Sequence, residues 1–493
     1  MAAAIPRSEE EIERDDLFHD LLERRPITAR LERYYNGDHD LPVVQESVRE
    51  QQRRKGRWVE FMKLLKLSRA NWCELVVEAV VQRLKVVGFR FGTPAPGGTP
   101  VDPIGWDIWQ NNNLDARSKL VHRDALTTGY GYALVWPSDR VPGGVSITIE
   151  HPSQCYVETD CETQIATSGI KSWIDDGIEY ITLFLPDFVY KWQRPAPGTE
   201  KPSAKDAGKW KVRIVPGEEW PLPNPLGVVP LLECCPRPRT LGDARSELDG
   251  LLDIQDRINF TIFNRVLAAW FTSVRQRWVT GISIDEDEET KQPREPFESA
   301  VDRVWYSSDP ETRFGEFASI DLSPFITAAE SDIAMMAGIA QMPPQYLLSG
   351  IGKASGESLK VSESSLIAKV LDRRTFIEEF WEAVIRTALI AIGHPGAFDL
   401  ATEVEWGDPE HRTEGELVDA LVKMRTLGVP LEVLWRRWGA SPQQIPLWRA
   451  MALQENLSAS LAAPPNGTPA EIASPMTPEP MAEEPISPAL GYD

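Results

Sequence analysis

The chain is predicted to run out along one long helix, pass through a short strand-rich stretch and return along a second helix. The outgoing helix covers about residues 243–271, and the returning helix covers about 324–338. Apolar residues recur every three or four positions along the outgoing helix, at Leu248, Leu251, Leu252, Ile258, Ile262, Val266 and Leu267. At about 1.5 Å per residue this helix would be roughly 40 Å long, which is unusual for a globular domain.

The segment before this helix pair mixes helices and strands. Residues 8–35 have a helical apolar pattern, but Pro26 lacks a backbone N–H, so two helices are expected there. A helix followed directly by a strand is predicted twice, at 69–85 with 86–91 and at 114–128 with 129–136. Residues 144–235 alternate apolar and polar side chains between frequent Gly and Pro, which predicts a β-rich region.

The segment after the helix pair is predicted to be helical. One long helix covers residues 357–392 and contains no Pro or Gly, and three shorter helices cover 413–427, 430–438 and 442–455. Residues 456–493 contain eight prolines and no Lys or Arg, which predicts a disordered acidic tail. Helices and a separate β-rich region together favour the α+β class.

The charge of the chain limits what it can bind. With 74 acidic and 52 basic residues, the formal net charge is −22. A general nucleic-acid binder needs a basic face, so this balance suits a protein that must not adhere to DNA.

The five cysteines are odd in number and form no C-x-x-C motif, which indicates a reducing compartment. No secretory signal and no apolar run long enough for a membrane span is visible.

Motifs for catalysis and metal binding are weak. The glycine-rich stretch at 350–356 lacks the phosphate-loop pattern, because Ala354 follows Gly352 and Lys353, and Leu347 stands where the first glycine is needed. This favours a flexible interhelical loop. The six histidines show no metal-ligand spacing, and no G-x-S-x-G motif occurs. The sequence therefore predicts a protein that is not an enzyme and needs no cofactor or metal.

The 17 tryptophans admit two interpretations. They could form a carbohydrate-binding platform, or they could serve core and interface packing. Packing is favoured because several fall in amphipathic segments, namely Trp72, Trp106, Trp109, Trp381 and Trp435.

Five short motifs follow one another between about residues 30 and 390. They comprise Leu31, Tyr34, Tyr35, Gly37, His39, Leu41 and Pro42; the segment 71–91 with Arg83, Leu84, Val86, Gly88 and Phe89; Trp106, Trp109, Asn112, Leu114 and Asp115 with 122–126 and 129–132; Ile254, Gln255, Asp256 and Asn259; and 342–347 with 355–359. In this order they resemble the portal proteins of siphoviruses, particularly those of actinobacterial phages. The ordered set carries the resemblance, since no single motif is decisive.

The resemblance implies a portal fold with four named parts. A mixed α/β wing would cover 1–242, joined by the long helix 357–392. The stem would be the helix 243–271 and the returning helix 322–339, with the clip at 272–321 between them. A tunnel loop would cover 340–356, a helical crown 393–455, and the tail 456–493.

The resemblance also implies partners and a location. It predicts a ring, expected to be a dodecamer, at the capsid vertex of the virion and in the host cytoplasm during assembly. Double-stranded DNA would pass through the ring, which would also contact the terminase large subunit, a head–tail adaptor, the major capsid protein and a scaffolding protein.

Two sets of candidate site residues follow. The tunnel-loop residues expected near DNA are Gly350, Gly352, Lys353, Ser355 and Gly356. The clip residues expected to contact the terminase or the adaptor are Asp285, Glu286, Asp287, Glu288 and Glu289, although this acidic run could also be a solvated hairpin tip.

Two other functions stay open from the residues alone. One is a carbohydrate-active or other acidic enzyme, suggested by the tryptophans and carboxylates. The other is a different minor capsid protein. An enzyme should be a small oligomer with a pocket, whereas a portal should be a very large ring.

Overall fold

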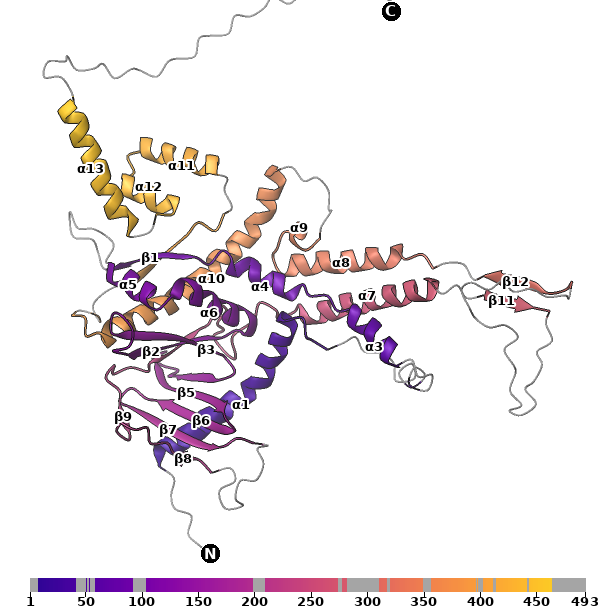
Figure 1. Ribbon diagram of the computed structural model, residues 1–493, viewed down its shortest axis with the longest axis horizontal. Helices are drawn as coiled ribbons and strands as arrows, with labels where there is room; N and C mark the ends of the chain where they lie inside the picture. The colour runs from indigo at the N-terminus through magenta and orange to yellow at the C-terminus, as the bar shows by residue number, and fades with distance from the viewer. Residues whose placement is uncertain are drawn as a thin grey trace, which may run out of the picture.

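The protein has an elongated α+β body with a helical arm on one side and a cluster of helices at one end (Figure 1). The computed structural model describes residues 8–40, 50, 53, 58–91, 103–197, 209–273, 277–281, 310–316, 320–348, 356–395, 397, 402–410, 414–440 and 443–462. Helices and strands alternate over the first half of the chain, and helices dominate the second half. The predicted α+β class is confirmed.

An antiparallel sheet and the first helix form one end of the body. The strands are β4 (Cys155–Thr159), β5 (Ala166–Asp175), β6 (Ile178–Phe184), β7 (Phe188–Pro195) and β8 (Lys211–Val212) in that order, with β9 (Leu222–Pro223) paired to β7. Helix α1 (Glu9–Tyr35) packs on this sheet through a cluster of Leu17, Phe18, Leu21, Ile170, Ile181, Leu183 and Trp192. The β-rich region expected from the alternating pattern is confirmed.

Helix α1 continues through Pro26, so the prediction of two helices was wrong. A proline inside a helix removes one hydrogen bond and costs about 3 kcal/mol or more. Here the helix is buried on both sides of the proline, by Leu17 and Leu21 before it and by Thr28 and Leu31 after it. Tertiary packing therefore holds the two halves in one helix.

A second layer surrounds a three-stranded sheet in the order β10 (Leu231–Cys234), β2 (Gly131–Pro137) and β3 (Val145–Glu150). The helices around it are α4 (Cys73–Val81), α5 (Pro103–Asn111), α6 (Leu114–Thr128) and α10 (Gly356–Ala391). The predicted bounds of α6 agree with the structure, and those of α10 agree within one residue at each end. The largest hydrophobic cluster of the described residues lies here.

Strand β1 (Val86–Phe91) pairs in antiparallel fashion with β13 (Thr402–Trp406). The partner strand lies at 402–406, in the part of the predicted crown to which no individual helix had been assigned, so this strand was not predicted from the sequence. Edge strands expose unpaired N–H and C=O groups, and β1 satisfies them with a segment more than 300 residues later. The pairing joins the C-terminal part of the chain to the body.

Tryptophans fill the centre of the large cluster. Trp109 and Trp381 are fully buried and meet edge to face with ring centroids 4.7 Å apart. The indole N–H of Trp381 donates to Nε2 of His122 over 2.8 Å. Burial lowers the pKa of His122 to about 3, so its ring is neutral and accepts this bond. Core packing, the favoured interpretation, is confirmed for these tryptophans.

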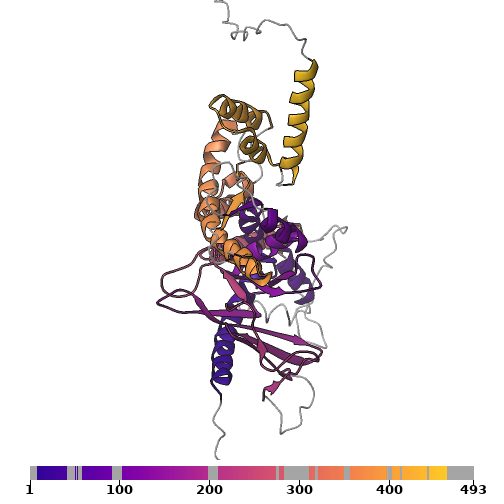
Figure 2. The ribbon, with the colours of Figure 1, turned by 90° about the vertical axis from the view of Figure 1, so that its left-hand side faces the viewer.

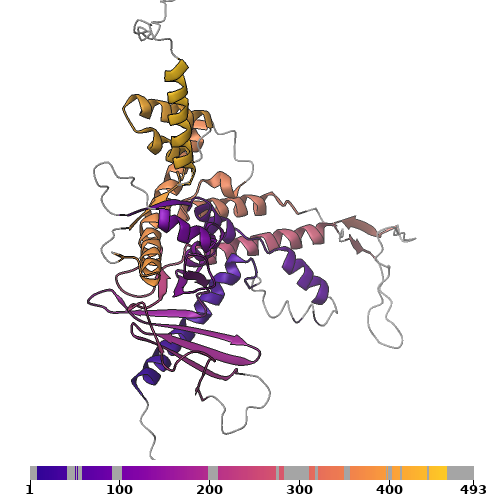
Figure 3. The same ribbon diagram turned by 60° about the vertical axis from the view of Figure 1, so that its left-hand side comes forward.

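The arm consists of two helices with a strand pair at its far end (Figure 3). Its elements are α7 (Leu252–Ser273), β11 (Arg277–Thr280), β12 (Arg313–Glu316) and α8 (Ser323–Ile339). The short helix α9 (Pro344–Leu347) follows α8, and α3 (Trp58–Leu67) packs on α7. The returning helix has the expected bounds to within one residue.

Helix α7 begins nine residues later than predicted. Residues before it are used in tertiary hydrogen bonds: the hydroxyl of Ser246 donates to the carbonyl of Thr127 over 2.5 Å, and the N–H of Glu247 donates to the carbonyl of Leu126 over 2.8 Å. Gly250 also has a left-handed φ of +80°. Helix α7 therefore has 22 residues and is about 33 Å long.

Three helices form a cluster beyond α10, at the opposite end of the molecule from the sheets (Figure 2). They are α11 (Glu414–Thr426), α12 (Leu431–Trp438) and α13 (Gln444–Ala462). Helix α13 includes residues 456–462, so the expected disordered tail began too early. An ion pair of 3.1 Å between Arg436 and Glu405 links α12 to β13.

Two glycines in one predicted motif have clear structural reasons. Gly129 ends α6 with a φ of +94°. A Cβ on Gly131 would lie 2.7 Å from Cγ2 and 2.8 Å from the carbonyl oxygen of Val121. Strand β2 therefore approaches α6 too closely for any side chain at that position.

Replacing Gly131 with alanine should destabilise the body by roughly 1–3 kcal/mol, because the new methyl group overpacks the contact with Val121. Differential scanning fluorimetry measures the change as a lower melting temperature. Gly407→Ala is the matched control, since its Cβ would meet neighbours only at 3.6 Å or more. Equal melting temperatures for the two variants would contradict the close approach.

Candidate functional site

The arm is a candidate assembly surface because it leaves apolar side chains uncovered. Helices α7 and α8 lie antiparallel, with an ion pair of 2.8 Å between Arg257 and Asp332. Phe260, Ile326, Met335 and Ile339 are between 42% and 52% exposed on this pair. A helix that is apolar on several sides is normally buried, and exposed apolar surface of this kind marks a protein contact.

Buried amides fix the root of the arm to the turn between α3 and α4. Gln255 accepts the N–H of Trp72 over 3.0 Å and donates to the carbonyl of Ala70 over 2.7 Å. One turn later, Asn259 accepts the N–H of Ala70 over 3.0 Å. Both side chains are buried, and these backbone groups supply the hydrogen bonds that their polar atoms need.

The same root contacts the first motif of the chain. Asn259 Nδ2 lies 2.5 Å from Nε2 of His39, whose pKa is lowered by burial, so the neutral ring accepts the bond. Tyr34 stacks on His39 with ring centroids 4.8 Å apart and donates to Asp256 over 2.8 Å. Burial, with the bond to Asp256, raises the pKa of Tyr34 to about 12.

The motif around Pro343 and Pro344 meets the second motif. The indole N–H of Trp72 donates to the carbonyl of Leu347 over 3.2 Å, and Arg83 donates to the hydroxyl of Tyr346 over 3.0 Å. Four of the five motifs thus converge at the root of the arm. Their order was recognised in the sequence, but their roles were not. One local feature of the sequence could have pointed to this root. Two amides four residues apart, Gln255 and Asn259, interrupt an otherwise apolar stripe of the helix.

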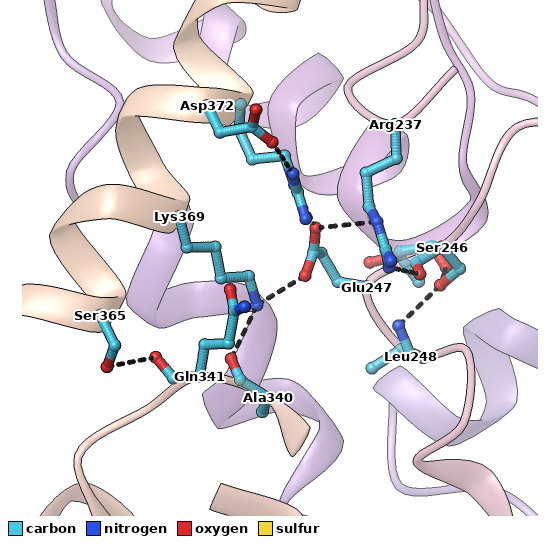
Figure 4. A network of polar contacts seen from close by, with 11 residues as sticks. Arg237, Ser246, Glu247, Leu248, Ala340, Gln341, Ser365, Lys369 and Asp372 are labelled. Carbon is cyan, nitrogen blue, oxygen red and sulfur yellow. Dashed lines mark hydrogen bonds and ion pairs between the residues drawn. The ribbon is translucent and has the colours of Figure 1, made fainter. Parts of the chain in front are cut away.

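A buried charge cluster completes the root (Figure 4). Glu247 precedes α7 and pairs with Lys369 at 2.5 Å and Arg373 at 2.6 Å, both on α10. Lys369 also donates to the carbonyl of Ala340 at the C-terminal end of α8, over 3.0 Å. Burial alone would raise the pKa of Glu247, but the charges of Lys369 and Arg373 outweigh it and lower that pKa. Glu247 and Lys369 together therefore join the segment before α7 to α10 and to the C-terminal end of α8.

The structure does not test the predicted site residues. Gly350, Gly352, Lys353 and Ser355 lie outside the described residues, and Gly356 is the first residue of α10. The acidic run Asp285, Glu286, Asp287, Glu288 and Glu289 also lies outside them, in the segment between β11 and β12.

Metal and membrane features were also sought in the part of the chain that the structure describes. There, no group of three His, Cys, Asp or Glu side chains could hold a metal ion. The cysteines, all of them described, are free thiols. Among the described helices, none combines the length and the apolar character that crossing a membrane needs.

An elongated subunit whose arm exposes apolar faces belongs to the class of proteins that assemble with further chains. Residues 14–440 match the family model described as phage portal protein, SPP1 Gp6-like. The chain belongs to this family of phage portal proteins. No curated protein matches it.

Family membership confirms the resemblance to phage portal proteins that was found in the sequence. It favours neither of the two alternatives, an acidic enzyme or a different minor capsid protein. The family is structural rather than enzymatic, and it implies an oligomeric ring and a place in the phage capsid.

Replacing Glu247 with glutamine should lower the free energy of unfolding by about 3–5 kcal/mol, because the buried Lys369 would lose its carboxylate partner and Arg373 would keep only its pair with the exposed Asp372. Urea denaturation measures this loss. Glu432→Gln is the control, since its partner Arg449 is half exposed and such a pair contributes up to about 1 kcal/mol. Similar losses in both variants would contradict the role of the buried cluster.

The pH dependence of stability provides a second readout. The pKa of Glu247 is lower in the folded than in the unfolded chain, so its contribution is present above the ordinary value of 4.5 and is lost as pH falls through the folded pKa. The wild-type protein should therefore lose stability more steeply below pH 4.5 than the E247Q variant. Parallel curves would show that Glu247 is not held as a buried carboxylate.

Proposed function

We propose that the chain is the repeating subunit of a ring-shaped channel at the capsid vertex, through which the genome is packaged, retained and ejected and to which the tail is joined. The observation that supports this most directly is the arm, which pairs α7 with α8, has β11 and β12 at its tip and exposes apolar residues on both helices. A ring with cyclic symmetry gives every subunit a neighbour on each side to cover such faces.

The four portal parts are proposed to follow the elements of the structure. The two sheets with α1, α4, α5, α6 and α10 form the wing. The helices α7 and α8 form the stem, and β11 and β12 belong to the clip. The crown is the cluster of α11, α12 and α13, while β13 belongs with the wing because it pairs with β1.

The channel needs to pass DNA without holding it. Dense positive charge would bind phosphates tightly through counterion release, and the net charge of −22 avoids this. The two helices of the arm follow the same balance, with Asp253, Asp256, Glu330 and Asp332 against Arg257 and Arg265.

The partners are proposed from the same role. Twelve subunits form the ring, which encloses double-stranded DNA and contacts the major capsid and scaffolding proteins. The acidic run at 285–289 offers a charged patch to the terminase large subunit and later to the head–tail adaptor. The protein acts in the virion and assembles in the host cytoplasm.

Native mass spectrometry of the purified protein should find a large closed oligomer, and the variant Ile326→Glu should shift it toward single chains. Losing the burial of one isoleucine costs about 1.5–3 kcal/mol per interface, and the new charge adds to this. Ile165→Glu is the control, because Ile165 is 66% exposed in the segment between β4 and β5, away from the arm. A folded wild-type monomer would overturn the proposed function.

Lys353 is the one charged residue among 345–356 and is proposed to touch phosphates lightly as DNA passes. Lys353→Glu should leave ring formation unchanged, because the substitution lies outside the arm and the crown. It should reduce DNA filling of assembled particles, measured as the DNA content of purified heads, because a glutamate repels phosphates. Lys353→Arg is the control that keeps the charge. Normal filling by the K353E variant would count against this role.

A further inference from the structure

Helices α11 and α12 enclose an apolar groove of about 260 Å³ that no described part of the same chain fills. It is lined by Val418, Leu421, Val422, Arg425, Leu431, Leu434, Trp435 and Trp438. Helix α11 buries none of its residues, and Val422 is 57% exposed. A groove with such a lining normally receives an apolar helix face from another element.

Helix α13 has apolar residues on two sides. On its inner side, Trp448 packs against Trp435 and Trp438 of α12, with ring centroids 5.7 Å and 5.8 Å apart. On its outward side, Leu447 is 59% exposed and Met451, one turn later, is 53% exposed. Leu453 is exposed too, but it lies two residues after Met451 and therefore points to a different side of the helix. The outward face is thus a helix face without a partner among the described residues.

The groove and the outward face of α13 do not meet within one chain, because no described residue of α13 lines the groove and Leu447 and Met451 are exposed. Trp435 and Trp438, which line the groove, contact α13 through Trp448, and the ridge of Leu447 and Met451 beside Trp448 stays uncovered. Figures 1 and 2 show α13 at the edge of the three-helix cluster with its outer side free. Any partner for the outward face must come from elsewhere.

The ring of the portal family supplies such a partner. In a ring of more than two subunits the contacts are heterologous, so each subunit must present two different, complementary surfaces to its two neighbours. The groove and the outward face of α13 form such a complementary pair on one chain. Their charges agree as well, because Arg425 is the charged residue of the groove lining, and Glu455 lies exposed one turn after Met451 on α13.

We propose that the outward face of α13 from one subunit seats in the α11–α12 groove of the next copy of this chain, closing a continuous belt of helices around the ring. Leu447 and Met451 enter the groove between α11 and α12, and Glu455 pairs with Arg425 at its edge. The inference rests on the proposed ring and specifies a contact within it that is separate from the arm.

Disulfide trapping tests the contact. The variant Val422→Cys with Met451→Cys, made in a Cys161→Ser background to remove the exposed native thiol, places one thiol in the groove and one on α13. Mild oxidation should produce a ladder of covalent oligomers on a non-reducing gel. Each single-cysteine variant should stop at dimers, because one engineered thiol per chain cannot extend a ladder. A cross-linked single chain, or dimers alone from the double variant, would overturn the inference.

An exchange of the two charges is the second part of the experiment. Arg425→Glu should reduce the ladder roughly two- to fivefold, the range expected when an exposed ion pair becomes a repulsion. Adding Glu455→Arg should restore the yield of the ladder. A yield that changes with neither substitution would contradict the proposed seating.

Native mass spectrometry on the same samples separates the two hypotheses. Rings without a ladder reject the α13 contact and leave the proposed function standing. Single chains without rings reject the proposed function, and this inference with it.

Discussion

The arm depends on one buried carboxylate at its root. Glu247 precedes α7, and its pairs with Lys369 and Arg373 attach that point to α10, while Lys369 reaches the last turn of α8 through the carbonyl of Ala340. Burying a charge is unfavourable unless it is fully paired, and here each oxygen has a cationic partner. Because both arm helices are tied at the same point, the arm leaves the body in a defined direction.

The body differs from the arm and the three-helix cluster in how its apolar residues are covered. The body has its own core, centred on Trp109 and Trp381, and its sheets are covered by α1, α6 and α10. The body also exposes some large apolar side chains, but the three-helix cluster buries very little, since α11 buries none of its residues and α12 only Leu434, and the arm helices expose Phe260, Ile326, Met335 and Ile339. Membership of the phage portal family gives this contrast a meaning, since a subunit of a ring needs a stable unit and surfaces reserved for its neighbours.

Sequence periodicity located several helices closely. The bounds of α6, α8, α10, α11 and α12 were predicted to within one residue, although α11 buries none of its residues. It failed where tertiary contacts override local preference. Pro26 lies inside a continuous helix held by burial on both sides, and the start of α7 is displaced by hydrogen bonds from Ser246 and Glu247 to the end of α6.

The sequence by itself determined the α+β class, most of the helices and, through ordered motifs, the portal family, because these depend on residues close together in the chain. Only the tertiary structure decided how the motifs act. Tyr34, His39, Gln255 and Asn259 become one network at the root of the arm, and β1 finds its partner β13. Contacts between segments some 200 to 300 residues apart leave no periodic trace in either segment, since each pattern records only whether a position is buried and not what covers it.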